Sequence, residues 1–213
     1  MKKKHVVEIH RKLKKKHIVY IIRKKKIIIG IDLGIKEYAI TFNGKEFKHY
    51  KNFNKVDNEL KRLRKQLVNK NNNVSNKRFI DDIDKLIEEN IENIINDILS
   101  DNNIKSIKIE DLNIKEMKES NKLKLKNSKY INKMIDDCRW DLFRDILQKE
   151  CNKKNINLIL VPQYYPSSKL CNNCGNYLDI RLEERTYICP YCGQVIDRDE
   201  NASINIRNYN LHN

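Results

Sequence analysis

The stretch Ile27-Ile28-Ile29-Gly30-Ile31-Asp32 is a short, continuous apolar run that ends in a carboxylate. A run of this kind is expected for a central strand buried on both faces of a sheet. Two more strands are expected over residues 38–42 and 46–50, and the Asn43-Gly44 step between them predicts a type I′ hairpin. The three strands together predict an antiparallel meander.

The rest of the chain alternates between helical and strand patterns. The expected elements are a helical region over 57–99 with a turn in the Asn-rich segment 69–75, a strand over 106–110, a long helix through 131–146, a strand over 156–161 that Pro162 ends, and a short helix over 201–207. This order predicts an α/β protein with a mixed sheet of three meander strands and two crossover strands, flanked by helices.

Three carboxylates stand at the ends of these elements: Asp32 ends the first strand, Glu110 ends the fourth, and Asp199 lies at the start of the last helix. An ionised carboxylate at the end of an apolar strand is costly without a partner or a metal. Because the first and fourth strands are expected to be neighbours, we expect the three side chains to converge. Hard oxygen ligands suit Mg²⁺ or Mn²⁺, and two such ions can support phosphodiester hydrolysis. Asp32, Glu110 and Asp199 are therefore the predicted catalytic metal ligands.

A simpler interpretation of the same residues needs no metal. Asp32 would cap the turn at Leu33-Gly34, Glu110 would be a solvated strand end, and Asp199 would be the N-cap of the last helix.

Two Cys-x2-Cys pairs, Cys171/Cys174 and Cys189/Cys192, predict one structural zinc site. Each pair is followed directly by a glycine that gives a metal knuckle the backbone freedom it needs. The 14 residues between the pairs are slightly fewer than is usual for this spacing. The other two cysteines, Cys138 and Cys151, stand apart and are expected to remain thiols. Lys169, Arg181, Arg185 and Arg198, in and beside this segment, are candidate contacts to a phosphate backbone.

The chain is basic, with 44 Lys and Arg against 29 Asp and Glu in 213 residues and a net charge of +15. Residues 1–26 alone contribute +11. The excess favours a nucleic-acid partner, although an AT-rich coding bias would also produce many lysines. The Lys-rich start also fits a nuclear targeting signal.

No run approaches the roughly 18–20 apolar residues of a membrane helix, and the amino end lacks the apolar core of a secretory signal. We therefore expect no membrane association and no secretion. The expected location is the cytoplasm or nucleoid of a prokaryote, or the nucleus if the source is viral or eukaryotic.

Assembled, these motifs resemble the carboxyl-terminal part of the TnpB/OrfB family of transposon-encoded proteins, kin of the type V CRISPR effector nucleases and the Fanzor proteins. The matching stretches are Gly30-Ile31-Asp32-Leu33-Gly34-Ile35-Lys36 with the first RuvC motif and Ile109-Glu110-Asp111-Leu112-Asn113 with the second. The segment from Pro166 through Cys171-Asn172-Asn173-Cys174-Gly175 to Cys189-Pro190-Tyr191-Cys192-Gly193 matches the zinc ribbon. The third RuvC motif is matched by Asp197-Arg198-Asp199-Glu200-Asn201-Ala202-Ser203-Ile204-Asn205-Ile206.

The resemblance implies an RNase H-like, RuvC-type fold with an inserted four-cysteine zinc ribbon. It implies a nuclease domain over 27–164 with 195–213, the ribbon over 165–194, and a basic hairpin over 1–26 as the remnant of an N-terminal barrel. Most of the family's N-terminal RNA-binding region is expected to be missing. In the family pattern the metal-binding aspartate directly precedes x-Asn, which selects Asp199 over Asp197.

By this resemblance the chain would be a Mg²⁺- or Mn²⁺-dependent DNA endonuclease of a mobile element, with structural zinc, DNA as substrate and a guide RNA as a further partner. The alternative is a noncatalytic or truncated nucleic-acid-binding protein.

Overall fold

The computed structural model describes residues 26–49, 74–124, 127–181 and 183–210. The hairpin expected in residues 1–26, apart from Lys26, lies outside the described residues. So do the part of the helical region before residue 74 and nearly all of the Asn-rich turn expected over 69–75. Among the described residues, no helix is both long and apolar enough to cross a membrane.

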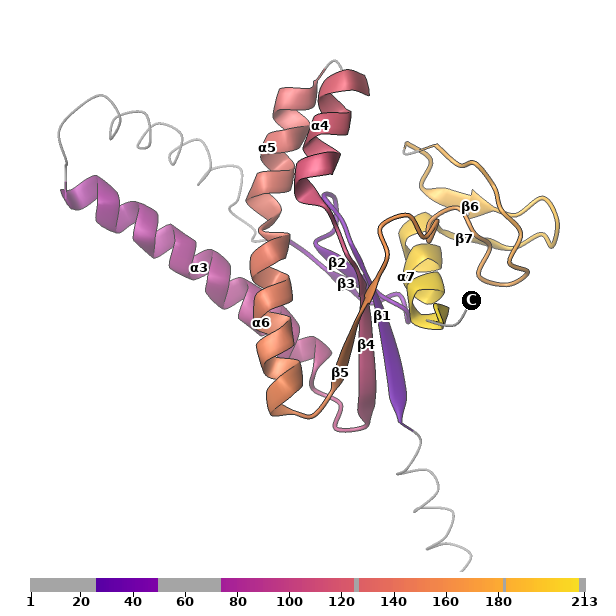
Figure 1. Cartoon of the computed structure of the whole chain (residues 1–213), viewed down its shortest axis with the longest axis horizontal. Helices are drawn as coiled ribbons and strands as arrows, with labels where there is room; N and C mark the ends of the chain where they lie inside the picture. Colours follow the sequence, from indigo (N-terminus) through magenta and orange to yellow (C-terminus); the bar gives the residue numbers. More distant parts are fainter. Residues whose placement is uncertain (1–25, 50–73, 125–126, 182, 211–213) are drawn as a thin grey trace, which may run out of the picture.

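The centre of the structure is a five-stranded mixed sheet with the order β3-β2-β1-β4-β5 (Figure 1). Its strands are β1 (Ile27–Leu33), β2 (Ala39–Thr41), β3 (Glu46–Phe47), β4 (Ile104–Glu110) and β5 (Asn157–Val161). Strand β1 pairs in parallel with β4, and β4 pairs in parallel with β5. The β2 strand is antiparallel to both β1 and β3. The predicted mixed sheet, with the first and fourth strands as neighbours, is confirmed.

Five helices accompany this sheet in the described part of the chain. They are α3 (Val74–Ile98), α4 (Ile114–Lys124), α5 (Ser128–Cys138), α6 (Trp140–Lys153) and α7 (Arg198–Asn208). Figure 1 shows α6 on one side of the sheet and α7 on the other. The main apolar core lies on the α6 side, where Ile31 and Ile107 of the sheet pack in one cluster with Ile95 of α3 and Phe143 of α6. The buried residues of α7, on the other side, include both polar and apolar side chains: Asn201, Ala202, Ser203, Asn205 and Ile206.

The turn between β2 and β3 differs from the expected type I′ hairpin. A type I′ turn requires a positive φ at both central residues, but here only Gly44, with φ 74°, is positive. The Gly44 amide donates to the Thr41 carbonyl at 2.8 Å, and the Thr41 amide donates to the Lys45 carbonyl at 3.0 Å. These bonds define a three-residue loop, in which a type I turn is followed by a left-handed glycine. The type I′ prediction is wrong because Asn43 takes the ordinary backbone conformation.

The long helix expected through 131–146 is in fact two helices. Arg139 separates α5 from α6 with a left-handed φ of 52°, and its side chain donates to Asp84 of α3 at 2.7 Å. The apolar spacing continues across the break because α6 begins at the next residue. Helix α4 was not expected. Asn113 caps it by accepting from the Glu116 amide at 3.1 Å.

Candidate functional site

The site begins with the contact between α7 and strand β1 at Gly30. A side-chain Cβ at this position would lie 2.1 Å from the Ser203 carbonyl oxygen and 2.4 Å from the Arg207 amide nitrogen. Only glycine allows the helix backbone to approach this closely. The neighbouring strand supports the same contact, because the Lys108 ammonium group donates to the Arg207 and Tyr209 carbonyls at the end of α7. These contacts fix α7 against the sheet.

Asp32 and Glu110 lie on the face of the sheet that α7 covers. Successive side chains of a strand alternate between faces, and Gly30 and Lys108, which are register partners, both face α7. Two residues further along, Asp32 and Glu110 therefore face α7 as well, at the same end of two adjacent parallel strands. Both side chains are half-buried.

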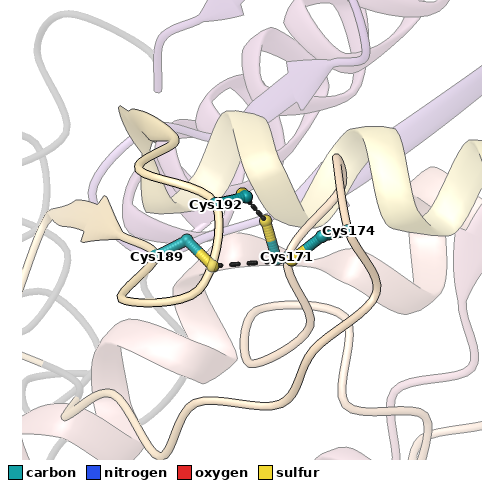
Figure 2. Close-up of side chains that lie close together, drawn as sticks. All are labelled: Cys171, Cys174, Cys189 and Cys192. Carbon is teal, nitrogen blue, oxygen red and sulfur yellow. Dashed lines mark hydrogen bonds between the residues drawn. The ribbon is translucent and has the colours of Figure 1, made fainter.

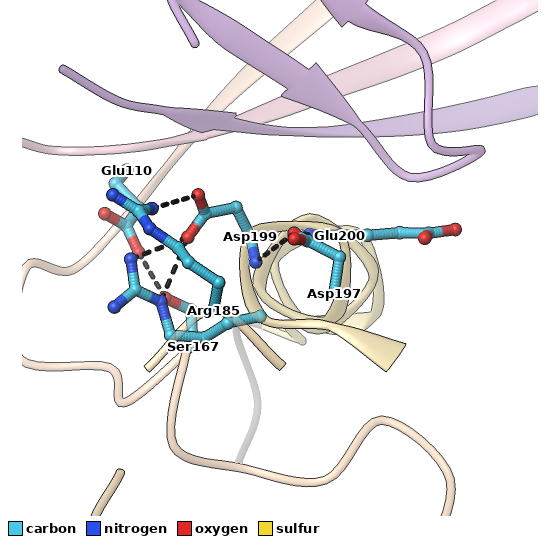
Figure 3. A network of polar contacts seen from close by, with 7 residues as sticks. Glu110, Ser167, Arg185, Asp197, Asp199 and Glu200 are labelled. Atoms are coloured by element: carbon cyan, nitrogen blue, oxygen red, sulfur yellow. Dashed lines mark hydrogen bonds and ion pairs between the residues drawn. The ribbon is translucent and has the colours of Figure 1, made fainter. Parts of the chain in front are cut away.

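Asp199 comes to this face from the first turn of α7. Asp197 is the N-cap residue, and its carboxylate accepts from the amides of Asp199 and Glu200 at 2.8 and 3.1 Å (Figure 3). The interpretation of Asp199 as the N-cap is therefore wrong. The cap also explains why α7 begins at Arg198 and not at residue 201.

Asp32 lies close enough to Glu110 and Asp199 for their negative charges to act on it. The pKa of Asp32 is raised well above its usual value, first by burial and then by the negative charges of Glu110 and Asp199. Burial also raises the pKa of Glu110, against the opposing effect of a hydrogen bond from the Ser167 hydroxyl. Like charges held together in a partly buried place favour a cation between them, so the donor set fits Mg²⁺ or Mn²⁺.

Two arginines donate hydrogen bonds to the Asp199 carboxylate. Arg185 donates to one oxygen at 2.8 Å (Figure 3). Arg198 donates to the other oxygen at 2.8 and 3.0 Å. The oxygens of Asp32, Glu110 and Asp199 do not all lie within 4.8 Å of one another. In the described residues only the four paired cysteines meet that condition. A shared metal at the carboxylates would require Asp199 to exchange at least part of its arginine contacts.

The four cysteines form a compact cluster with all their sulfurs within 4.8 Å. The sulfurs of Cys171 and Cys192 lie 3.6 Å apart, as do those of Cys174 and Cys189 (Figure 2). A zinc–sulfur bond of about 2.3 Å places the thiolates of a tetrahedral site about 3.8 Å apart. The separations are far longer than a disulfide bond. The cluster therefore has the ligand set and spacing of a closed structural zinc site.

The local backbone presents the sulfurs to one point. The Gly175 amide donates to the Cys171 carbonyl at 2.8 Å, and the Gly193 amide donates to the Cys189 carbonyl at 3.0 Å. Both glycines have φ 73°, which suits residues without a Cβ. The Asn176 side chain donates to the Cys174 sulfur at 3.3 Å and is the largest cause of lowering the pKa of this thiol to about 6. Burial, in contrast, raises the pKa of Cys171 to about 11.

A small second core supports the four-cysteine segment. Strands β6 (Thr186–Ile188) and β7 (Val195–Asp197) pair antiparallel. Tyr187 of β6 is fully buried and packs in one cluster with Cys171, Ile180 and Cys189. The Tyr187 hydroxyl donates to the Lys169 carbonyl at 3.0 Å. Because β7 runs directly into α7, this segment also determines where α7 begins.

Two asparagines that the sequence motifs contained, but for which no role was predicted, join α7 to the ribbon. Asn201 donates to the Leu170 carbonyl at 2.7 Å and accepts from the Asn172 amide at 3.0 Å. Asn205 donates to the carbonyls of Ser167 and Leu170 at 2.8 and 2.7 Å. Their spacing of four residues on one helix face is the signal that could have identified them.

All four residues predicted to touch a phosphate backbone already have an ion-pair partner within the chain. Lys169 pairs with Asp179 and Arg181 pairs with Glu184. Arg185 and Arg198 both pair with Asp199. The last two lie beside the carboxylate site, whereas the first two pair within the ribbon.

Comparisons with known proteins agree with this architecture. Residues 140–206 match the family model described as Cas12f1-like, TNB domain. The chain is 35% identical over 102 residues to a protein of Streptomyces pristinaespiralis named "Putative RNA-guided DNA endonuclease", a match that covers 47% of this chain and 23% of that protein. A protein of Mycobacterium tuberculosis with the same descriptive name is 36% identical over 53 residues, which are 25% of this chain and 11% of that protein.

Two solved structures resemble the fold. "Cryo-EM structure of the Cas12f1-sgRNA-target DNA complex" gives a TM-score of 0.62 at 19% identity, covering 85% of this chain and 50% of that one. "Cryo-EM structure of CRISPR-Cas12f Ternary Complex" gives 0.61 at 18% identity, covering 85% and 38%. The match therefore spans less than a quarter of the curated relatives' length and at most half of the solved chains. The resemblance to TnpB/OrfB proteins seen in the sequence is confirmed, and residues 140–206 match the Cas12f1-like TNB domain model.

Proposed function

We propose that this chain is the nuclease part of a TnpB-type, RNA-guided DNA endonuclease, with Asp32, Glu110 and Asp199 as its catalytic metal ligands. The observation that carries the proposal is the placement of Asp32 and Glu110 at the same end of adjacent parallel strands, on the face covered by the helix that carries Asp199. Asp199 does not cap α7, because Asp197 is the N-cap residue.

The metal would be held by the three carboxylates. When bound, Mg²⁺ or Mn²⁺ would activate a water and stabilise the leaving oxygen in phosphodiester hydrolysis. Ser167 would hold the Glu110 carboxylate in place through its hydrogen bond. Arg185, which is 42% exposed, would turn from Asp199 toward a substrate phosphate, because a guanidinium group binds phosphate and carboxylate with the same fork of donors.

The four cysteines would hold zinc in a structural role. A closed site of four thiolates leaves no position open for water. Its contribution to function would be to stabilise the segment between β5 and α7, and thereby to position Asp199 and Arg185.

A second candidate is a noncatalytic nucleic-acid-binding protein. The specific observation in its favour is that both oxygens of Asp199 are engaged by arginines, so that the local negative charge is already compensated. Salt-dependent binding is expected for either function, because it depends on lysine and arginine.

Cleavage separates the two functions. The purified chain is incubated with labelled single- and double-stranded DNA and Mg²⁺, with and without candidate transposon-end RNA. Under the nuclease proposal the DNA is cut, and Asp32→Ala or Glu110→Ala abolishes cutting without weakening DNA binding. If the wild-type chain cuts nothing under all these conditions, the binding function is favoured.

A further inference from the structure

The two cysteine knuckles, residues 171–176 and 189–194, have the same backbone arrangement. In each, a glycine with φ 73° follows the second cysteine, and the residue after that glycine accepts through its carbonyl from the amide of the first cysteine. This residue is Asn176 in the first knuckle, with a bond of 2.9 Å, and Gln194 in the second, with a bond of 2.8 Å. Asn176 and Gln194 therefore occupy equivalent positions and can be compared directly.

The chain also pairs with itself at the base of each knuckle. Leu170, which precedes the first knuckle, forms an antiparallel bridge with Tyr177. Ile188, which precedes the second knuckle, is the register partner of Val195 on an antiparallel strand. The equivalence thus extends to the segments that hold the knuckles, so a difference between the two positions must come from their side chains.

The side chain of Asn176 contacts a cysteine sulfur, whereas that of Gln194 does not. The Asn176 amide nitrogen donates to the Cys174 sulfur at 3.3 Å. A thiolate accepts hydrogen bonds and cannot donate them, so an amide must meet it with the nitrogen. In the described part of the chain, Gln194 contributes only a backbone hydrogen bond to the sulfur of Cys192. The first knuckle therefore has a side-chain donor at a position where the second has none.

The sulfur that Asn176 contacts belongs to an exposed cysteine. Cys174 is exposed, whereas Cys171 of the same knuckle is only 1% exposed. Four thiolates carry more negative charge than one Zn²⁺ neutralises, and a hydrogen bond to a sulfur stabilises part of the excess. An exposed thiolate is also the one that water and competing chelators reach first. A donor at Cys174 therefore acts where the site is most open.

The knuckle that Asn176 supports is in contact with α7. Asn201 of this helix accepts from the amide of Asn172 and donates to the carbonyl of Leu170, the residues on either side of Cys171. A metal held firmly by the first knuckle would therefore also stabilise the start of the helix that carries Asp199.

We propose that Asn176 is a positioning residue of the zinc site, whose amide holds the Cys174 thiolate toward the metal and raises the affinity for zinc. The proposal rests on the structural zinc role proposed above and on none of the three carboxylates. Residues that hydrogen-bond to metal ligands contribute about 10- to 100-fold in metal affinity. Because Asn176 is exposed and water can replace part of its bond, we expect the lower value.

The first test measures zinc affinity of the full chain by competition with a colorimetric chelator at neutral pH. Asn176→Ala should raise the dissociation constant for zinc about tenfold. Asn176→Asp keeps the shape of the side chain but places a carboxylate oxygen beside the sulfur, so its loss of affinity should be greater. Gln194→Ala and Gln194→Glu make the same changes at the equivalent position. Gln194→Ala should bind zinc like the wild type, and Gln194→Glu should lose less affinity than Asn176→Asp.

The second test uses Co²⁺ in place of zinc, because Co²⁺ also binds to tetrahedral thiolate sites and absorbs light by charge transfer from sulfur. A hydrogen bond lowers the energy of the sulfur lone pairs. Asn176→Ala should therefore move the charge-transfer band of the Co²⁺ form to longer wavelength, and Gln194→Ala should leave it in place. A substitution that only loosened the fold would weaken binding without moving the band.

The outcomes separate this proposal from the zinc role on which it rests. A wild-type chain that binds no zinc would overturn both. Zinc binding by the wild type with unchanged affinity in the Asn176 variants, or equal weakening by the matched Gln194 variants, would overturn the role of Asn176 alone. A loss of affinity in Asn176→Ala without a shift of the Co²⁺ band would do the same. None of these results depends on whether the chain cuts DNA.

Discussion

Because α7 lies so close to Gly30, the substitution Gly30→Ala is expected to displace this helix. The added Cβ would meet backbone atoms of α7 at 2.1 and 2.4 Å, and ordinary contact begins at 3.4 Å. Backbone atoms cannot rotate away as the end of a side chain can, so the helix must move by about 1.3 Å or more. Because Asp199 lies in the first turn of α7, this movement would separate it from Asp32 and Glu110.

The magnitude follows from two effects. Overpacking a tight contact costs about 1–3 kcal/mol, which a protein with the usual 5–15 kcal/mol of stability survives. Misplacing a catalytic group by about 1 Å can cost about 100-fold in rate. Gly30→Ala should therefore fold, with a lower melting temperature, and should cleave DNA about 100-fold more slowly than the wild-type chain.

The assay is Mg²⁺-dependent single-turnover cleavage, measured beside the melting temperature. Ala39→Val is the matched control, since it overpacks a fully buried site in β2 whose register partner, Leu33, belongs to the core on the α6 side. It should lower the melting temperature to a similar extent but retain most of the activity. Equal losses of activity in the two variants, or wild-type cleavage by Gly30→Ala, would refute the reasoning.

Three further predictions concern the supports of the site. Lys108→Met keeps most of the side-chain volume but removes the hydrogen bonds to the end of α7. This substitution should lower the free energy of unfolding by about 2 kcal/mol, which corresponds to roughly 4–8 °C in the melting temperature. Lys105→Met, at an exposed position of β4, should change the melting temperature little. Cys189→Ser should release zinc, measured by mass spectrometry of the purified chain, while one zinc per chain is expected in the wild type; retention of a full equivalent would contradict the four-thiolate site. Mg²⁺ should raise the melting temperature of the wild-type chain but not that of Asp32→Asn, because only a ligand that binds the folded state stabilises it; an equal rise in both would place the ion elsewhere.

The sheet and the four-cysteine cluster were predictable because their signals are local. The apolar runs of β1 and β4 each lie within seven residues, and both were predicted near their true positions. The adjacency of Asp32 and Glu110 then follows from parallel pairing and the alternation of side chains. The four-cysteine site was likewise predicted from the short spacing within each cysteine pair, and the four sulfurs lie close together in the structure.

What could not be predicted depends on contacts between distant residues or on single backbone angles. Arg139 breaks a continuous helical pattern through one left-handed φ, and nothing in the apolar spacing marks it. The hydrogen bond from Lys108 to Arg207 joins residues 99 positions apart. Arg185, which directly precedes β6, forms an ion pair with Asp199 of α7. Arg185 was predicted to contact phosphate, and its partner within the chain is instead a carboxylate.

Asp32, Glu110 and Asp199 are proposed to form a metal-dependent nuclease centre. The most direct measurement is cleavage of labelled DNA by the purified chain with Mg²⁺, supplied with candidate guide RNA, beside Asp32→Ala, Glu110→Ala and Asp199→Ala. We predict cleavage by the wild type and its loss in each variant, with the zinc content and the melting temperature in the absence of Mg²⁺ retained. Cleavage that persists in all three variants, or a wild-type chain that binds DNA and never cuts it, would contradict the claim.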